Sequence, residues 1–347
     1  MRSRLAVFAA AAAVLAACGS ASPKLVSIGA GLSGPEGLHA TVYADGPAKV
    51  AAFAFDAQGR LWLATADDTD TGKDGVYLVA ERGARPVEVV ANLHTPLGLV
   101  WYRNTLYVAS RDRVDAFSDL RGRTFATRRK ILTLPAKVGE SNNLVLAPDG
   151  RMLLGISAPC DHCTPTSKLS AAIVSFRPDG TDLRVYAGGI RAPVGLEYYP
   201  GTSDLLVTMN QRDDLGSRTP GDWLALVDAG QNWKSPNCYG QGGPSCVGVP
   251  QPIAVLDKHG AVAGIAIVTG QLGSAVGTSA LVAEWAKNTV MRVSLDRHGT
   301  RYRGHVSTLV TGIQNPVAVT LTGTGDLLIG DWADGTIYEI TGPTSSP

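Results

Sequence analysis

Short apolar strands alternate with tight polar turns along almost the whole chain, and one two-strand phrase recurs six times. In each copy an apolar strand enters a turn, and a second apolar strand then ends in a polar residue. The second strands begin at Arg60, Thr105, Arg151, Asp204, Ser279 and Asp326. Strand-rich repeats of about 40–50 residues are typical of β-propellers. Six copies therefore predict an all-β fold, a six-bladed β-propeller with one central channel.

One interval between repeats is longer than the rest, and the two ends of the chain complement each other. The extra residues form an insertion loop at about 209–262, and a long ordered loop in a compact domain is usually functional. At the ends, Ala40–Ala44 precedes the first repeat and Thr336–Ile340 closes the last. We expect these two segments to pair, because closing the ring leaves few exposed strand edges.

The strand order also predicts which face carries the function. If the first strand of each blade runs down the channel wall and the second runs back, residues before first strands and after second strands share one face. The polar residues in these positions include His94, Glu140, Asn142, Arg191, His259, Arg111, Arg212, Asp213, Glu284, Lys287 and Asp331. The opposite face carries mostly Gly, Asn and Asp residues of tight turns. We therefore expect the site at the channel mouth formed by the first set.

Composition supports a single exported propeller. The chain has 347 residues, of which 45% are hydrophobic and only 6% aromatic, with 40 glycines and 20 prolines. This suits short strands and many turns. The formal net charge of +1 gives no indication of a nucleic-acid partner. The repeats predict one domain at 36–341, followed by a tail at 342–347.

The first residues resemble a bacterial lipoprotein signal. Arg2 and Arg4 precede an apolar run at 5–15, which is too short to remain as a spanning helix. Cleavage after residue 17 and lipidation of Cys18 would leave a tether at 18–35. The lipid alone would then hold the exported protein at the outer face of a bacterial membrane. The alternative is an ordinary signal peptide that contains a cysteine.

The remaining cysteines form two close pairs. Cys160 and Cys163 enclose two residues, and Cys238 lies near Cys246. An exported protein folds in an oxidising compartment, so both pairs are expected to be disulfides. A metal site at the first pair stays as an alternative. A c-type haem needs a His directly after the second Cys, where this chain has Thr164.

Several motifs follow one another in the second part of the chain. They are the strand and turn at 143–150, the cysteine loop at 157–163, the phrases at 188–196 and 210–213, and the aromatic loop at 230–240. From about Asn142 to the C-terminus this ordered series resembles the quinoprotein sugar dehydrogenases. The resemblance is to the sorbosone dehydrogenase branch of the soluble glucose dehydrogenase family.

The resemblance implies pyrroloquinoline quinone (PQQ) and calcium in the propeller mouth, with oxidation of a sugar or polyol by hydride transfer to the quinone. It implies that Arg191 binds the carboxylates of the quinone, facing the channel axis, and that Arg212, Lys287 and Asn142 are further cofactor-binding residues. It also implies calcium ligands at Trp233, Pro236 and Asp213, since calcium prefers carbonyl and carboxylate oxygens. An electron acceptor or protein partner in the cell envelope would follow from such a reaction.

The chemical positions depart from the family pattern. The general base of the family is a His, and Gly139 stands there; His94 and then Glu140 are the candidate catalytic replacements. Ala192 replaces an Asn that contacts the cofactor in the family, and Lys234-Ser235 replaces Gly-Trp in the metal loop.

Two hypotheses follow. The first is a sugar dehydrogenase with a diverged site, and the second is a non-catalytic propeller lipoprotein that binds a carbohydrate or a protein partner. A calcium-dependent lactonase is a third class, which would need metal-directed carboxylates from Glu284, Asp331 and Asp213.

Overall fold

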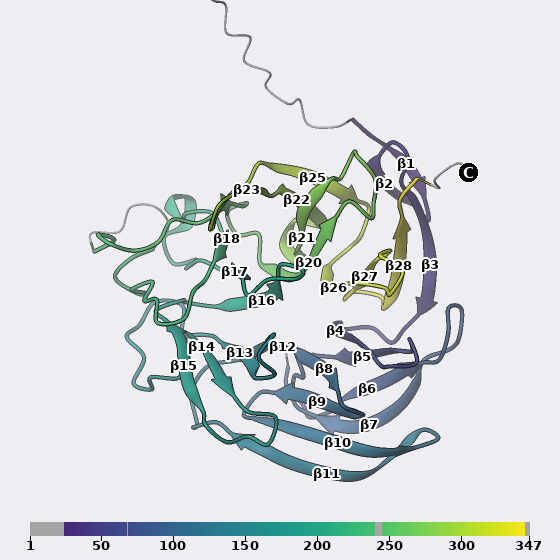
Figure 1. The fold of residues 1–347 in the computed structure, drawn as a ribbon, viewed down its shortest axis with the longest axis horizontal. Helices are drawn as coiled ribbons and strands as arrows, with labels where there is room; N and C mark the ends of the chain where they lie inside the picture. The colour runs from purple at the N-terminus through teal and green to yellow at the C-terminus, as the bar shows by residue number, and fades with distance from the viewer. Residues whose placement is uncertain (1–23, 68, 240–244, 344–347) are drawn as a thin grey trace, which may run out of the picture.

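The computed structural model describes residues 24–67, 69–239 and 245–343 and has six β-sheet blades arranged around a central axis (Figure 1). Each blade contains four antiparallel strands, innermost first, as the repeats predict. Cys18 and the predicted signal at 1–17 lie outside the described residues. Among the described residues no helix is long and apolar enough to cross a membrane.

The blades follow chain order. Blade 1 contains β4 (Val50–Phe55), β5 (Leu61–Thr65), β6 (Asp74–Val79) and β7 (Val87–Leu93); blade 2 contains β8 (Gly98–Tyr102), β9 (Thr105–Ser110), β10 (Arg113–Arg121) and β11 (Thr124–Thr133). Blade 3 contains β12 (Ser141–Leu146), β13 (Met152–Ile156), β14 (Ala172–Phe176) and β15 (Arg184–Gly188); blade 4 contains β16 (Pro193–Tyr198), β17 (Leu205–Met209), β18 (Trp223–Leu226) and β19 (Ala254–Val255). Blade 5 contains β20 (Val262–Thr269), β21 (Thr278–Glu284), β22 (Thr289–Ser294) and β25 (Val306–Thr311); blade 6 contains β26 (Pro316–Leu321), β27 (Leu327–Asp331), β28 (Thr336–Thr341) and β3 (His39–Asp45). A hairpin of β23 (Asp296–His298) and β24 (Arg301–Arg303) extends from blade 5, and two 3₁₀ turns lie at Gly216–Arg218 and Trp285–Lys287.

The second strand of each blade is buried on both faces because a neighbouring blade packs against each side. All five residues of β5 are buried, and so are those of β13 and β17. Trp62 in β5 has no exposed surface and stacks on Trp101 of the next blade, with ring centroids 5.5 Å apart. These continuous apolar strands provide the blade-to-blade core on which the polar loops rest.

The ring closes as the sequence predicts. Strand β3, from the start of the chain, pairs antiparallel with β28 at the end, and Ile337 lies opposite Ala44. Blade 6 is therefore built from both ends of the chain, which holds the ring closed.

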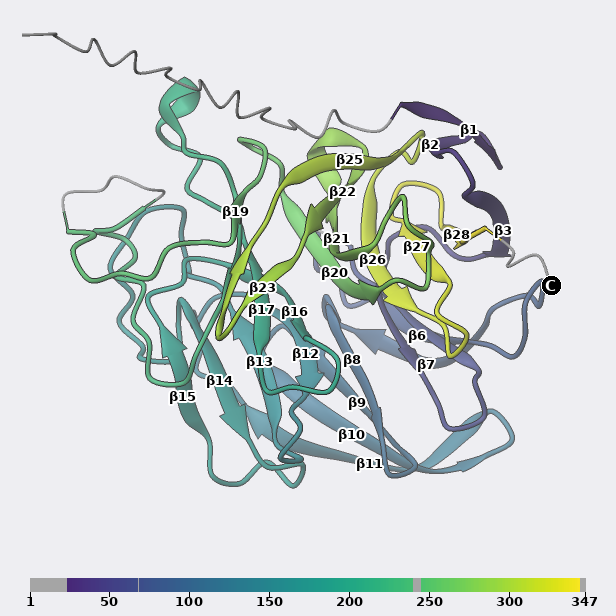
Figure 2. The same ribbon diagram turned by 45° about the horizontal axis from the view of Figure 1, so that its top comes forward.

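The predicted tether at 18–35 is wrong for its second part. β1 (Leu25–Gly29) and β2 (Leu32–Pro35) form a hairpin, and β2 joins the outer strand β25 of blade 5 (Figures 1 and 2). Leu32 and Ile28 are buried in the core cluster between blades 5 and 6. Burial of these side chains explains why the segment is ordered rather than extended in solvent.

The insertion at 209–262 and both disulfides belong to the wall of blades 3 and 4. The structure confirms the bonds Cys160–Cys163 and Cys238–Cys246. The two sulfurs of the first pair are bonded to each other, so they are not available as metal ligands.

The central channel is narrow, and most of the side chains that line it are apolar. A cavity of about 60 Å³ lies among the inner strands of all six blades, with Ala51, Leu97, Val194, Ala263 and Val317 in its lining. A sugar or a cofactor would therefore have to bind at the mouth and not within the channel.

Candidate functional site

Loops from different blades meet at the mouth. His94, before the first strand of blade 2, contacts Asp70 of blade 1, and His259, before blade 5, contacts Asp213 of blade 4. The Asn315 amide of blade 6 donates to the carbonyl of Trp285 in blade 5. Residues before first strands and after second strands therefore share one face, as the strand order predicts.

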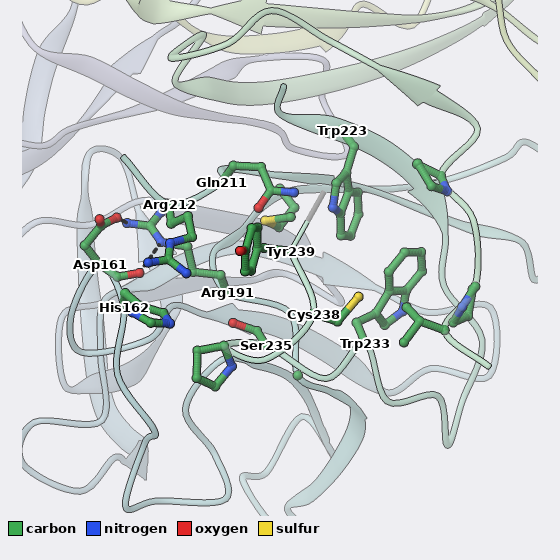
Figure 3. A pocket seen from close by; sticks show the side chains of 16 residues that line it. Asp161, His162, Arg191, Gln211, Arg212, Trp223, Trp233, Ser235, Cys238 and Tyr239 are labelled. Carbon is green, nitrogen blue, oxygen red and sulfur yellow. Dashed lines mark hydrogen bonds and ion pairs between the residues drawn. The ribbon is translucent and has the colours of Figure 1, made fainter. Parts of the chain in front are cut away.

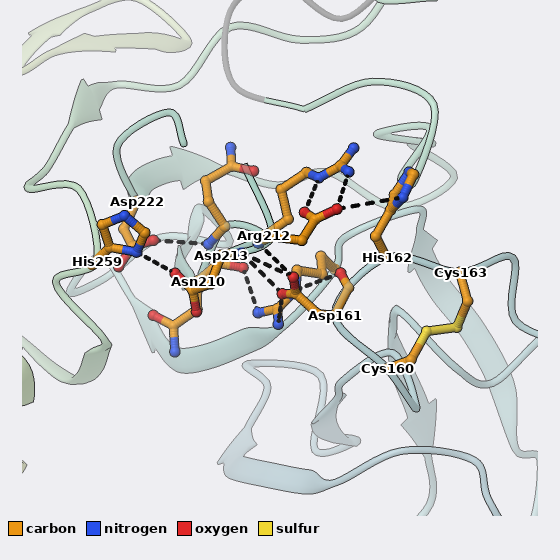
Figure 4. Close-up of polar contacts among 12 residues, drawn as sticks. Cys160, Asp161, His162, Cys163, Asn210, Arg212, Asp213, Asp222 and His259 are labelled. Atoms are coloured by element: carbon orange, nitrogen blue, oxygen red, sulfur yellow. Dashed lines mark hydrogen bonds and ion pairs between the residues drawn. A yellow bond between two sulfur atoms is a disulfide. The ribbon is translucent and has the colours of Figure 1, made fainter. Parts of the chain in front are cut away.

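Arg191 is bound on three sides by protein groups. Its Nη2 donates to Oδ1 of Asp161 at 2.6 Å, its Nε donates to the Asp161 carbonyl at 3.1 Å, and its Nη1 donates to the Asn210 carbonyl at 3.2 Å. The Asp161 carboxylate also accepts the backbone N–H groups of Asp213 and Asp214, and Figure 4 shows Asp161 beside Asp213. The guanidinium of Arg191 is therefore paired with a carboxylate of the protein, Asp161.

Arg212 is also neutralised. Its Nε and Nη2 both donate to the carboxylate of Asp214, and its guanidinium lies 4.7 Å from the centre of the Tyr239 ring. Figure 3 shows Arg191, Arg212 and Tyr239 around one pocket of about 30 Å³. That volume is roughly the share of one water molecule in the liquid, about 30 Å³.

The predicted metal loop lines the same pocket. The Trp233 ring is buried against Trp223, with centroids 4.6 Å apart. Lys234 O accepts from Cys238, but the carbonyls of Trp233 and Pro236 accept no hydrogen bond among the described residues. These two carbonyl oxygens are therefore without a hydrogen-bond donor in the described part of the chain.

The other predicted metal ligand, Asp213, points elsewhere. It accepts from Nδ1 of His259 at 2.6 Å, and Nε2 of His259 contacts the Gly216 carbonyl at 3.1 Å. The Asp213 hydrogen bond and then the Gly216 carbonyl raise the pKa of His259. Both ring nitrogens are used, so His259 is not available as a base at the mouth. Lys287, near this pair, forms no ion pair in the described part of the chain.

Asn142 belongs to the channel wall. It is 1% exposed, and its amide nitrogen donates to Oγ of Ser157 and to the carbonyl of Pro193. One hydrogen bond stays within blade 3 and the other joins blade 3 to blade 4, so both amide protons have partners in the protein.

The two candidate catalytic residues lie close to one acidic residue. Nδ1 of His94 is 3.0 Å from Oδ1 of Asp70, and Oδ2 of the same carboxylate accepts a hydrogen bond from Arg111. Nε2 of His94 has no hydrogen-bond partner in the described ranges. Desolvation raises the pKa of Glu140, although the nearby Arg111 opposes this and Asp70 adds to it. Glu140 is exposed to solvent. Burial by itself would raise the pKa of Asp70, but the hydrogen bonds from Arg111 and His94 lower this pKa further than burial raises it. The Asp70 carboxylate therefore stays ionised.

Glu284 is a buried carboxyl without a cation. It has no exposed surface, Oε1 accepts from Asp257 N at 3.2 Å, and Oε2 has no partner among the described residues. A Cβ placed on Gly260 would lie 3.2 Å from Glu284 Oε1 and 3.3 Å from Asp222 Oδ2, so the two carboxyls flank one glycine. Burial raises the pKa of Glu284 to about 7 and that of Asp222 to about 6.

We expect the free energy of unfolding to depend on the proton of Glu284. The folded pKa lies above the ordinary value, so the folded state binds the proton more tightly and loses stability as pH rises from about 4.5 through 7. Glu284→Gln should remove this loss and gain about 2–3 kcal/mol relative to the natural chain between pH 4.5 and pH 8, at about 1.4 kcal/mol per pKa unit. Urea unfolding across that range measures it, with the exposed Glu36→Gln as control. An offset that stays constant with pH would contradict this assignment.

The other carboxyl considered for a metal is also used. Asp331 is 1% exposed and accepts backbone N–H groups from Gln314, Asn315 and Ala333. Among the described residues no three His, Cys, Asp or Glu side chains are grouped to hold a metal ion. The lactonase hypothesis therefore lacks its ligand set.

Sequence reasoning missed Asp161, Asp214 and Asp70, which determine the charge of the mouth. The sequence shows Asp161 only as a residue of the Cys160–Cys163 loop, whereas in the structure its carboxylate joins this loop to the loop that follows β17. Its position between two bonded cysteines is the one sequence signal, because such a short disulfide loop presents its central side chains rigidly.

The comparisons agree with the propeller fold. No family model and no curated protein matches the chain. The PQQ domain of a pyranose dehydrogenase from Coprinopsis cinerea, in holo form, superposes with a TM-score of 0.73 at 14% identity, covering 93% of this chain and 99% of that one. The PQQ-bound aldose sugar dehydrogenase of Streptomyces coelicolor gives 0.70 at 18% identity, with 89% and 99% covered. A calcium structure of a carbohydrate-active enzyme from Trichoderma reesei gives 0.73 at 16% identity, with 92% and 97% covered.

The chain thus has the six-bladed propeller fold of PQQ-dependent sugar dehydrogenases. The residues at its mouth do not fit a quinone held as the resemblance implies. Arg191 and Arg212 are paired with Asp161 and Asp214, so neither guanidinium is free to bind the carboxylates of a quinone. At the position of the family base, a Cβ on Gly139 would lie 1.9 Å from the Ser157 carbonyl oxygen, so no side chain can stand there.

Proposed function

We propose that the mouth of this propeller binds a neutral sugar or polyol, and that the protein is a carbohydrate-binding member of the sugar-dehydrogenase fold that does not hold a quinone. The observation that carries the proposal is the Arg191–Asp161 pair, at 2.6 Å. The exported, lipid-anchored state predicted from Cys18 is part of the proposal, since it would place the mouth among extracytoplasmic carbohydrates.

The charge of the mouth favours a neutral ligand. PQQ carries three carboxylates, which need unpaired cations to hold them. Arg191 and Arg212 are already paired with Asp161 and Asp214, so these ion pairs offer a trianion little net positive charge. A sugar brings hydroxyl groups, which can donate to these same carboxylates and accept from Lys287.

An aromatic pair at the rim of blades 5 and 6 supports sugar binding. Trp285 is 37% exposed and meets the edge of Trp332, with ring centroids 5.8 Å apart. Trp332 is fixed, because its Nε1 donates to the Ala66 carbonyl at 2.9 Å and the Lys49 ammonium lies 3.2 Å from its ring centre. A rigid aromatic face flanked by polar groups, including the Asn315 amide, suits the C–H face and the hydroxyls of a sugar ring.

We expect Trp285→Ala to weaken sugar binding about tenfold, because an aromatic contact contributes about 0.5–1.5 kcal/mol beyond its buried area. Titration calorimetry with a panel of aldoses, polyols and oligosaccharides measures the affinity. Trp101→Phe is the control, because Trp101 lies near the end of β8, on the side of the propeller opposite the mouth. Unchanged affinity in Trp285→Ala would remove the rim from the site.

A second candidate function is oxidation of the bound sugar. The observation in its favour is the His94–Asp70 contact, in which an ionised carboxylate orients the ring and leaves Nε2 to accept a hydroxyl proton. Protein supplied with calcium and PQQ is assayed for dye reduction by the same sugars. Turnover that disappears in His94→Gln would support this candidate, and no turnover in the natural chain would discard it.

A further inference from the structure

A second cavity opens on the face opposite the mouth, between blades 2 and 3. Its volume is about 680 Å³, and it lies among the β8–β9, β12–β13 and β14–β15 turns. In each blade the first and third strands end on the turn face, so these connections lie away from the mouth. Cavities of about 300–1,000 Å³ are the size that accepts small ligands.

The lining of this cavity is rich in arginine. Arg103, Arg129, Arg151 and Arg177 reach it from three turns and from the outer strand β11. Arg151 donates to Asp182 at 2.6 Å, but Arg103 and Arg129 form no ion pair within the described ranges.

The two carboxylates in the lining are occupied by their own turns. Oδ1 of Asp149 accepts from the backbone of Arg151 at 3.0 Å. Oδ1 of Asp179 accepts from the backbone and from the hydroxyl of Thr181, at 3.0 and 2.6 Å. These contacts hold one oxygen of each carboxylate within its own turn, and no ion pair joins either carboxylate to Arg103 or Arg129 in the described part of the chain.

Arg103 occupies a backbone position that does not suit it. Its φ is 47° and that of Asn104 is 58°, the left-handed pair of a two-residue hairpin turn that favours Asn and Gly. A non-glycine residue held there is strained. The guanidinium lies 5.0 Å from the centre of the Tyr102 ring, which also lines the cavity.

We propose that this cavity binds a phosphate ester. Guanidinium groups bind phosphate through paired N–H donors, and the Tyr102 and Tyr107 rings add apolar surface and hydroxyl donors for the rest of the ligand. The ester is a free metabolite, such as a sugar phosphate, or the headgroup of an anionic phospholipid. The site is independent of the sugar site proposed at the mouth.

The test uses glucose 6-phosphate against glucose, in calorimetry at constant ionic strength, and flotation with vesicles that contain phosphatidylglycerol. Arg129→Gln and Arg103→Asn should each weaken binding of the phosphate ester at least tenfold. Arg123→Gln, which removes the same charge at the β10–β11 hairpin outside the cavity, should leave it unchanged. Arg103→Asn should also raise the unfolding temperature, because Asn suits a positive φ, so its loss of binding cannot be ascribed to misfolding.

Each outcome decides the proposal. Saturable binding of glucose 6-phosphate that is lost in Arg129→Gln but kept in Arg123→Gln and in Trp285→Ala assigns a soluble ester, and vesicle binding that needs Arg129 but not Arg123 assigns a lipid headgroup. Equal losses in Arg129→Gln and Arg123→Gln, or no binding in either arm, would overturn it. Since the mouth residues are untouched, failure here leaves the sugar-binding proposal standing.

Discussion

Replacing Asp161 with asparagine should destabilise the protein by about 2 kcal/mol, because hydrogen bonds to a charged group contribute about 1.5–3 kcal/mol and partial exposure reduces this. The carboxylate accepts from Arg191 Nη2 at 2.6 Å and from the backbone N–H groups of Asp213 and Asp214 at 3.0 and 2.8 Å. It therefore holds the Cys160–Cys163 loop of blade 3 against blade 4. Urea unfolding at pH 7 measures the loss.

The same substitution should raise the affinity for PQQ at least tenfold over the natural chain, because Arg191 would regain an unpaired positive charge. Asp112→Asn is the control, since its carboxylate pairs with Arg113 at 3.0 Å on the exposed surface. An Asp161→Asn variant as stable as the natural chain and equally indifferent to PQQ would show that this pair does not determine the charge of the mouth.

Adding a methyl group at Gly139 should destabilise the protein by about 3–5 kcal/mol, combining backbone strain with overpacking. Gly139 has φ 114°, and its Cβ would lie 1.9 Å from the backbone oxygen of Ser157. Neither atom can move without disturbing the loop from β13, because Ser157 N is bonded to the Glu140 carbonyl. Thermal and urea unfolding of Gly139→Ala measure the effect.

Gly59→Ala separates the two causes. Gly59 also has a positive φ, 74°, but a Cβ there would meet nothing within 4 Å. It should cost only about 1–2 kcal/mol, the strain of a left-handed residue. Equal losses in the two variants would mean that Ser157 can yield, and that a base could be restored at position 139.

The blades could be predicted from sequence because each depends on a local pattern. Alternation of apolar strands and turns defines β5, β13 and β17, which are buried throughout. The pairing of β3 with β28 follows from closure of the ring. The sequence did not predict the β1–β2 hairpin, because this hairpin adds to the outer edge of blade 5 and does not repeat the two-strand motif of the blades.

The residues that lie at the mouth could be predicted from the sequence, but the ion pairs between them could not. Strand direction places His94, Arg191 and Arg212 on one face. Which carboxylate neutralises each cation depends on loops that meet only in the folded ring, as Asp161 does with Arg191 across blades 3 and 4. For this reason a sequence motif that contains Arg191 does not determine which group its guanidinium contacts.

Calorimetric titration of the natural chain with PQQ in the presence of calcium, beside titration with neutral sugars, tests the central claim most directly. Our account predicts no saturable binding of PQQ at micromolar concentration and saturable binding of at least one sugar or polyol that depends on Trp285. Stoichiometric PQQ binding by the natural chain, with Asp161 in place, would contradict it.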